Sequence, residues 1–180
     1  MLSDLQQKNI SAMFDALDAT ADGFLDRDDF TQRANQMCAA LAPDERSQHH
    51  QDLQRAYRQA WEQLRIRADA DDDGRLTREE YVTAVEKGIL QDPQYIEDAV
   101  LVVSRALFRA SDQDGDDVLS REEYVKMFTA IDMDGDMAAA GFDHIDRDGD
   151  GTISYSEFIE ALDGVFSSSD PSSLGANVFG

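Results

Sequence analysis

The 180-residue sequence has little of what disulfide-linked, membrane-spanning or nucleic-acid-binding proteins need. Its one cysteine, Cys38, cannot form an intramolecular disulfide, and we expect it to be a small buried hydrophobe in a reducing compartment. No apolar run is long enough to span a bilayer, and the first residues lack the basic and apolar regions of a signal peptide. With 16 Lys and Arg against 38 Asp and Glu, the net charge is −22, which opposes nucleic-acid binding. The sequence therefore predicts a cytoplasmic protein without nucleic-acid or membrane partners.

Residues that could carry out catalysis are also scarce. The three histidines, His49, His50 and His144, have no cysteine or acidic partner at metal-ligand spacing, and the first two fall in a predicted polar linker. The serine and threonine residues within the acidic segments are suited to act as metal ligands or helix caps, and we do not expect them to act as nucleophiles. We expect a binding protein and no enzyme.

What the chain has in abundance is aspartate, arranged in a twelve-residue pattern that occurs four times. The copies cover residues 18–29, 69–80, 112–123 and 146–157. Each places side-chain oxygens at positions 1, 3, 5 and 9, a carboxylate at position 12 and a branched aliphatic residue at position 8. This pattern is the EF-hand loop, whose oxygens, with the position-7 carbonyl, surround Ca²⁺ at about 2.3–2.6 Å.

The second and fourth loops meet every requirement of this pattern. In the second loop, ligand positions 1, 3, 5, 7, 9 and 12 hold Asp69, Asp71, Asp73, Arg75, Thr77 and Glu80. In the fourth loop they hold Asp146, Asp148, Asp150, Thr152, Ser154 and Glu157. Gly74 and Gly151 occupy position 6, where the bend needs a positive φ. Both loops are predicted to bind Ca²⁺.

The third loop departs from the pattern at one position. Its ligand positions hold Asp112, Asp114, Asp116, Val118, Ser120 and Glu123. Position 6 holds Asp117 instead of glycine, and a left-handed backbone costs a non-glycine residue roughly 1–2 kcal/mol, least for Asn and Asp. Since the free energy of ion binding should exceed that cost, we expect this loop to bind Ca²⁺, slightly more weakly than the second and fourth loops do.

The first loop is the least regular of the four. Its ligand positions hold Asp18, Thr20, Asp22, Phe24, Asp26 and Asp29. Thr20 offers a neutral oxygen, and Asp29 at position 12 is one methylene shorter than glutamate. Coordination then falls towards six, which narrows the preference for Ca²⁺ over Mg²⁺. We expect an ion here, and Mg²⁺ competition at this loop first; the alternative is an empty loop kept as a pairing partner.

A fifth acidic run imitates the pattern without completing it. Asp132, Asp134 and Asp136 alternate correctly, but Ala139 and Ala140 would stand at positions 8 and 9. The run also fills the short gap between the third and fourth loops, so we interpret it as an acidic turn between helices.

Amphipathic helices at i, i+3, i+4 spacing flank every loop. The fold class is therefore all-α, with four EF hands in two compact pairs and short antiparallel bridges between the position-8 residues of paired loops. The first loop pairs with the second across a long helix or linker, and the third pairs with the fourth. We expect domains at 1–90 and 91–166 and a tail at 167–180, with Gly88 ending the helix that follows the second loop. Capping boxes at Thr77–Glu80, Ser120–Glu123 and Ser154–Glu157 start three of the exit helices.

The four loops, the long first gap and the apolar tail resemble the sarcoplasmic calcium-binding protein family, including its bacterial calerythrin-like members, over essentially the whole chain. The resemblance implies a pair of EF-hand pairs, tight Ca²⁺ binding with some Mg²⁺ competition, and a buffering role. It also supports Asp29 as a ligand, since that family shares aspartate at this position. Calerythrin-like proteins have an irregular second loop and this chain has a complete one, so three or four ions are expected.

Three functions remain open at the level of sequence. The leading hypothesis is a monomeric intracellular Ca²⁺ buffer that stays closed. The second is a sensor that opens a methionine-rich groove to a target protein, although the six methionines are scattered. A photoprotein-like luciferin holder is the third, and a single Trp61 with three scattered histidines opposes it. The apolar end of the tail is either frayed or folded back over a groove.

Overall fold

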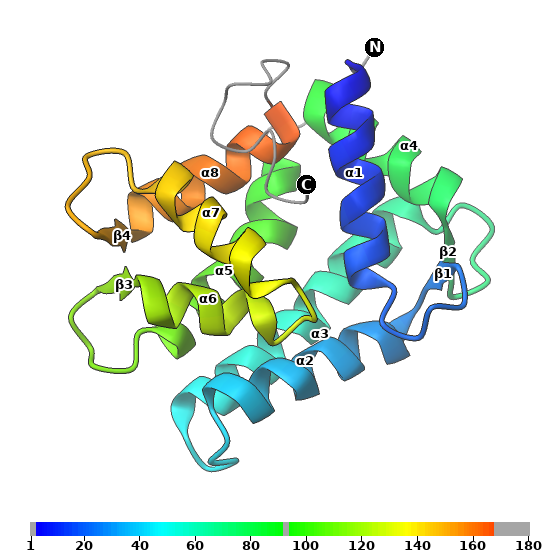
Figure 1. Ribbon diagram of the computed structural model, residues 1–180. Helices are drawn as coiled ribbons and strands as arrows, with labels where there is room; N and C mark the ends of the chain where they lie inside the picture. Colours follow the sequence, from blue (N-terminus) through cyan, green and yellow to red (C-terminus); the bar gives the residue numbers. More distant parts are fainter. Residues whose placement is uncertain (1–2, 92–93, 168–180) are drawn as a thin grey trace.

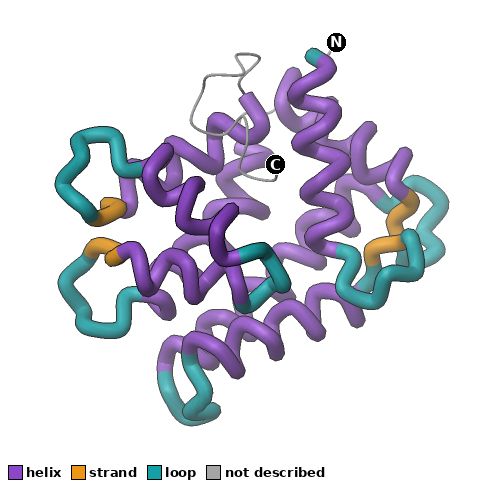
Figure 2. The backbone as a smooth tube through the Cα atoms, in the orientation of Figure 1, coloured by secondary structure: helices purple, strands orange, loops and turns teal. Residues whose placement is uncertain are grey.

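The computed structural model describes residues 3–91 and 94–167. Helices dominate this part of the chain, and the strands are two or three residues long (Figures 1 and 2). The elements in chain order are α1 (Asp4–Leu17), β1 (Phe24–Leu25), α2 (Arg27–Leu41), α3 (Gln48–Ala68), β2 (Leu76–Thr77), α4 (Arg78–Gln91), α5 (Gln94–Ser111), β3 (Val118–Ser120), α6 (Arg121–Thr129), α7 (Gly135–Ile145), β4 (Thr152–Ser154) and α8 (Tyr155–Ser167). The predicted all-α fold of four helix–loop–helix units is confirmed.

Local sequence explains where the first helices begin. The Ser3 hydroxyl accepts a hydrogen bond from the Gln6 N–H, and the Gln6 side chain accepts from the Ser3 N–H, so a capping box starts α1. Ser47 caps α3 by accepting from the His50 N–H at 3.2 Å. The 21-residue α3 is the long helix expected between the first two loops. It includes His49 and His50, so their placement in a linker was wrong.

The predicted end of a helix at Gly88 was also wrong. Gly88 lies inside α4, which continues to Gln91, and the residue is buried. Glycine in a helix interior costs about 1 kcal/mol relative to alanine. The helix α4 packs against α1, α3 and α5, and this packing outweighs the local cost.

The two EF-hand pairs share one core. Its members come from both halves of the chain: Phe14 of α1, Trp61 of α3, Phe108 of α5, Tyr124 of α6 and Phe158 of α8 are all at least 95% buried. The helix α3 packs along α5, and α1 packs against α8, so helices of one pair touch helices of the other. The division into domains at residues 90 and 91 stays a prediction, and the predicted tail lies outside the described residues apart from Ser167.

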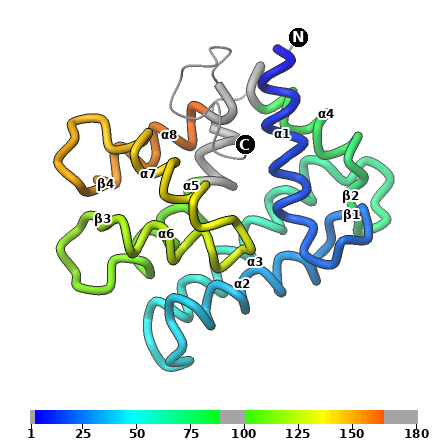
Figure 3. The backbone as a smooth tube through the Cα atoms, in the orientation of Figure 1, coloured from blue at the N-terminus to red at the C-terminus, as the bar shows by residue number. Residues whose placement is uncertain are grey.

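The loop pairs lie at opposite ends of the molecule. In Figure 1 the strands β1 and β2 lie at one end and β3 and β4 at the other, with α2 and α3 running along one side. Following the chain in Figure 3 shows the first two loops together and the last two together. The pairing of first with second and third with fourth is therefore as predicted.

Candidate metal centres

Each pair of loops is joined by a short antiparallel bridge at position 8. Leu25 pairs with Leu76, and Leu119 pairs with Ile153. All four side chains are fully buried, which explains why the position requires a branched aliphatic residue. The bridge ties the backbone of one loop to that of its partner.

The aspartate at position 1 shapes each loop through backbone hydrogen bonds. Asp18 accepts from the N–H groups of Asp22 and Gly23, at 3.2 and 2.9 Å. Asp69, Asp112 and Asp146 accept from positions 5 and 6 of their own loops, at 3.0 to 3.2 Å. The chain therefore curls around one carboxylate in the same way four times, the first loop included.

The glutamate at position 12 closes the second, third and fourth loops. One carboxylate oxygen of Glu157 accepts from the Ser154 N–H at 2.9 Å, and the other accepts from the Arg147 N–H at 3.1 Å. Glu80 and Glu123 accept from positions 9 and 2 of their loops in the same way. The position-9 hydroxyl completes each predicted capping box. The residue that would hold the ion also starts the exit helix.

These hydrogen bonds affect ionisation. Burial by itself would raise the pKa of Glu123 and Glu157, but the N–H and hydroxyl donors outweigh it, and each pKa lies below the usual glutamate value. The Thr77 N–H and hydroxyl lower the pKa of Glu80. The three carboxylates are therefore ionised at neutral pH and available to a cation.

Three loops gather carboxylate oxygens at the spacing that a calcium ion requires. Within each of three groups, one oxygen from every member lies within 4.8 Å of the others: Asp69, Asp71 and Asp73; Asp112, Asp114 and Glu123; Asp146, Asp148 and Glu157. Two oxygens on one Ca²⁺, each at about 2.3–2.6 Å, are at most about 5 Å apart. The donors are hard oxygens, which Ca²⁺ prefers, so the groups fit this ion. Bound there, Ca²⁺ would offset the charge of the assembled carboxylates.

Other predicted ligands in these loops lie outside the three groups. Asp116 and Asp150 each accept from the position-7 N–H, at 3.0 and 2.8 Å. Glu80 binds the Thr77 hydroxyl at 2.8 Å. Their ligand roles stay predictions.

The third loop accommodates its non-glycine bend. Asp117 has a φ of +66°, so it takes the left-handed conformation that the loop demands. Burial and the charges of Asp116, Glu123 and Asp112 raise the pKa of Asp114. These carboxylates repel one another, and a cation at their centre would relieve the repulsion.

The first loop differs from the others at position 12. Asp29 is fully buried, and its oxygens accept from the N–H groups of Asp26 at 2.8 Å and Thr20 at 3.0 Å. The second contact is at position 3 of the loop, where the longer glutamates of the other loops reach position 2. Among the described residues, this loop has no group of three carboxylate oxygens within 4.8 Å. Neutral Thr20 and the short Asp29 arm account for the difference.

Two features of the loops escaped the sequence reasoning. Asp26 and Asp29 form a fourth capping box, which a search for Ser or Thr with Glu or Gln does not detect. Position 4 has a positive φ in every loop: Ala21 and Asp72 adopt it at +56° and +58°, while Gly115 and Gly149 hold it in the other two. The glycines at position 4 of the last two loops were the available signal.

The fifth acidic run is a helix start. The Asp134 side chain caps α7 by accepting from the N–H groups of Asp136 and Met137, at 2.9 and 3.1 Å. Ala139, Ala140 and Asp143 lie within that helix, where no ion loop can form. The interpretation as an acidic turn between helices is confirmed.

An arginine at position 10 links the two hands of each pair. Arg78, in the second hand, stacks over Phe14 of the first hand at 4.3 Å and forms an ion pair with Asp15. Arg121, in the third hand, stacks over Phe142 of the fourth at 4.6 Å and forms an ion pair with Asp143. Both phenylalanines stand four residues before the partner loop. Tyr155, at position 10 of the fourth loop, meets Phe108 at 5.2 Å in the equivalent place.

Comparisons with known proteins agree with this geometry. Residues 102–163 match the EF-hand domain pair, and residues 10–32 and 66–85 match the EF hand. The chain therefore belongs to the EF-hand family of calcium-binding proteins. No helix in the described ranges combines the length and apolar character needed to cross a membrane.

The most informative relatives resemble the chain over nearly its whole length. Calerythrin from Saccharopolyspora erythraea is 27% identical over 81% of this chain and 82% of its own. A Streptomyces coelicolor calcium-binding protein is 31% identical, with a TM-score of 0.79 over 90% of this chain and 98% of its own. A sarcoplasmic calcium-binding protein from amphioxus, 22% identical, has a TM-score of 0.79 over 100% of this chain and 98% of its own, which shows the shared fold. The predicted resemblance to calerythrin and the sarcoplasmic proteins is confirmed.

Proposed function

We propose that this calcium-binding protein is a buffer, which takes up Ca²⁺ while its helices stay closed. The shared core carries the proposal. Apolar faces from both EF-hand pairs are buried against each other. Among the described large hydrophobic side chains, Ile66 at 71% and Met137 at 46% are the exposed ones. A sensor must expose an apolar groove on binding, and here that would require separating the two pairs.

We also propose which ions the loops hold. The second, third and fourth loops bind Ca²⁺ through the predicted ligands, with Glu80, Glu123 and Glu157 completing the sites at position 12. The first loop binds a fourth ion and is where Mg²⁺ competes best. The short Asp29 arm and neutral Thr20 reduce the number of oxygens, and Mg²⁺ favours six-coordinate sites.

The sensor remains the second candidate because of one relative. The Streptomyces coelicolor protein, 31% identical, is associated with prokaryotic calcium-mediated regulation. If this chain shares that role, Ca²⁺ must expose a surface that a target protein recognises. The proposal for this chain is instead a monomeric cytoplasmic protein with calcium ions as its partners and no catalytic activity.

Calorimetric titration with Ca²⁺, with and without Mg²⁺, tests both proposals. We expect four binding events in Ca²⁺ alone, and Mg²⁺ should weaken the one that an Asp29→Asn substitution removes. A hydrophobic dye added in parallel separates buffer from sensor. A sharp rise in dye fluorescence with Ca²⁺ but not with Mg²⁺ would establish the sensor and exclude the buffer.

A further inference from the structure

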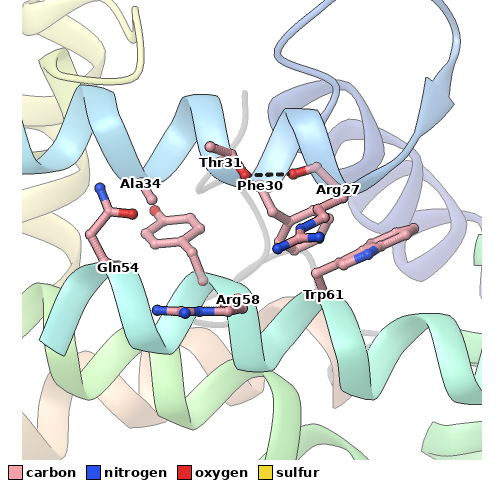
Figure 4. Close-up of a pocket in the computed structure, with 8 residues that line it drawn as sticks. Arg27, Phe30, Thr31, Ala34, Gln54, Arg58 and Trp61 are labelled. Carbon is pink, nitrogen blue, oxygen red and sulfur yellow. Dashed lines mark hydrogen bonds between the residues drawn. The ribbon is translucent and has the colours of Figure 1, made fainter. Parts of the chain in front are cut away.

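A pocket of about 230 Å³ lies between α2 and α3, apart from the ion loops' carboxylates. Its floor is made of buried aromatic side chains, Phe30, Tyr57 and Trp61, and the Phe30 and Trp61 rings lie 5.4 Å apart. Exposed Arg27 and Arg58 stand at its rim. Figure 4 shows side chains from both helices around the space between them, with Arg27 beside Phe30 and Trp61. The pocket thus combines an apolar floor with two cations.

The two arginines at the pocket have no acidic partner among the described residues. Within the described part of the protein, Arg27 and Arg58 have no ion pair and no side-chain hydrogen bond, whereas Arg78, Arg121 and Arg147 all pair with acids. A net charge of −22 leaves ample acid to pair them. Two unpaired guanidinium groups around one pocket favour an anion that contacts both.

A third polar group lacks a partner in the same place. Tyr57 is 6% exposed, lines the pocket, and its hydroxyl forms no hydrogen bond with any described residue. Among the described residues, the fully enclosed side-chain polar atoms without a partner are Arg33 Nε and Ser111 Oγ, so the Tyr57 hydroxyl is accessible from the pocket. An oxygen of a ligand in the pocket would give this hydroxyl a hydrogen-bond partner.

The position of Arg27 explains why it is free. Arg27 is residue 10 of the first loop, the position at which Arg78, Arg121 and Tyr155 stack on a phenylalanine of the paired hand. For Arg27 the equivalent residue, four before the second loop, is Arg65, which cannot serve as a stacking partner. Arg27 therefore lines the pocket instead of bridging the hands.

We propose that this pocket binds a small aromatic carboxylate. The ring would lie against Phe30 and Trp61, and the carboxylate would face Arg27 and Arg58. An apolar cavity of about 150 Å³ is enough to bind benzene. A pocket of about 230 Å³ therefore suits one ring and its carboxylate. A charged head and an apolar body match the two chemistries of the lining.

The pocket is joined to the first ion loop. Arg27 follows the predicted ligand Asp26 directly and precedes Asp29 by two residues, in the first turn of α2. An ion in this loop and a carboxylate on Arg27 would therefore act on the same turn of α2. If the ion changes the affinity for the carboxylate by some factor, thermodynamic linkage requires that the carboxylate change the affinity for the ion by the same factor. This link rests on the proposed ion at the first loop, whereas the pocket does not.

Trp61 is the only tryptophan of the chain, so its fluorescence reports on the pocket. The full-length protein in Ca²⁺ is titrated with benzoate, and with benzyl alcohol as the neutral probe. We expect a saturable change in Trp61 emission with benzoate at millimolar concentrations or below, and at least about tenfold weaker binding of benzyl alcohol. The absence of a saturable change, or equal affinity for both probes, would overturn the proposal.

Variants locate the binding. Arg27→Gln combined with Arg58→Gln should weaken benzoate binding at least about tenfold, while Arg46→Gln, an exposed arginine outside the pocket, should leave it unchanged. Both side chains are exposed, and circular dichroism checks that the double variant is folded. Undiminished benzoate affinity in the folded double variant places the site elsewhere and rejects the pocket.

Repeating the titration in Asp29→Asn tests the link separately. If the first loop binds an ion coupled to the pocket, Ca²⁺ changes the benzoate affinity of the parent protein but not of this variant. Benzoate affinity that is identical with and without Ca²⁺ in the parent protein rejects the link. This outcome leaves the proposal that the pocket binds benzoate unaffected. Calorimetric counting of ions then shows whether the first-loop site itself has failed.

Discussion

At the scale of single residues, the position-12 carboxylate performs two tasks at once. Glu157 belongs to the carboxylate group that would hold an ion in the fourth loop, and its oxygens accept from the N–H groups of Ser154 and Arg147. We therefore expect loss of this carboxylate to affect both ion binding and the first turn of α8. Aspartate at the same position of the first loop keeps the hydrogen bonds but shifts one of them along the chain.

Replacing this carboxylate should show both effects. In Glu157→Gln, the amide retains one acceptor oxygen, so one of the two N–H groups loses its partner and the ion loses a charged ligand. We expect one fewer Ca²⁺ per protein in calorimetry and a lower thermal midpoint. Glu45→Gln removes the same charge from an exposed turn and should change neither. Unchanged stoichiometry in Glu157→Gln would contradict the assignment.

The bend at Asp117 offers a second test at this scale. Asp117 has a φ of +66°, a conformation that glycine adopts without cost. Asp117→Gly should stabilise the protein by about 0.5–1 kcal/mol after allowing for the flexibility of glycine in the unfolded chain.

Urea unfolding would measure this difference, and Gly74→Asp provides the reverse change. Gly74 has a φ of +83° and no neighbour within 4 Å of an added Cβ, so backbone strain is the effect that remains. We expect Gly74→Asp to destabilise the protein. If Asp117→Gly also destabilises it, the Asp117 side chain has a role that the strain argument misses.

At the scale of elements, the position-10 residues join helices that are distant in sequence. Arg78 begins α4, yet it stacks over Phe14 and donates to Ser11 and Asp15 of α1. Arg121 makes the same kind of contact from α6 to α7. Because each arginine is residue 10 of one loop and each phenylalanine lies four residues before the partner loop, the contact can transmit a change in one loop to the other.

Removal of the contact between Arg78 and α1 should destabilise the first EF-hand pair. Arg78→Gln loses the stacking on Phe14 and the exposed ion pair, together worth about 1 kcal/mol. We expect a lower thermal midpoint and less cooperative Ca²⁺ binding in the first two loops. Arg46→Gln serves as the control, since its side chain is exposed and distant from the loops in sequence. Unaltered cooperativity would restrict Arg78 to a purely structural role.

At the scale of the whole molecule, repulsion between carboxylates destabilises the fold, while the core shared by the two EF-hand pairs stabilises it. The chain carries a net charge of −22, and four Ca²⁺ would supply eight positive charges and leave −14. Without ions the loop carboxylates repel one another, and that repulsion acts on a core that spans both pairs. Ion binding should therefore stabilise the entire fold.

Chelation tests this directly. We expect protein treated with a calcium chelator to unfold at a lower temperature. An ion that binds only the folded state adds about 2.7 kcal/mol per site to the free energy of unfolding when its free concentration is one hundred times its Kd. Mg²⁺ added to the chelated protein should restore a part of the loss through the first loop. Identical melting curves with and without Ca²⁺ would contradict the proposed role of the ions.

Much of the fold and the candidate site could be predicted because the determinants are local. Each loop's predicted ligands and capping box lie within twelve residues, so their spacing alone predicted the loops and the exit helices. The left-handed Asp117 followed from the same reasoning. Local steric and hydrogen-bonding rules decide these features regardless of what surrounds them.

Features that depend on distant partners required the tertiary structure. Gly88 by itself predicts the end of a helix, but α4 packs against three other helices and continues to Gln91. Arg78 and Asp15 are 63 residues apart, and nothing in their own neighbourhoods predicts that they meet. The pocket between α2 and α3 likewise exists because Arg27 and Arg58 are brought together with Trp61. The sequence by itself determined which oxygen donors each hand offers to an ion, because these donors lie within one twelve-residue loop. Only the packing of the hands decided which side chains of different hands face one another, because those contacts depend on the global arrangement of the helices.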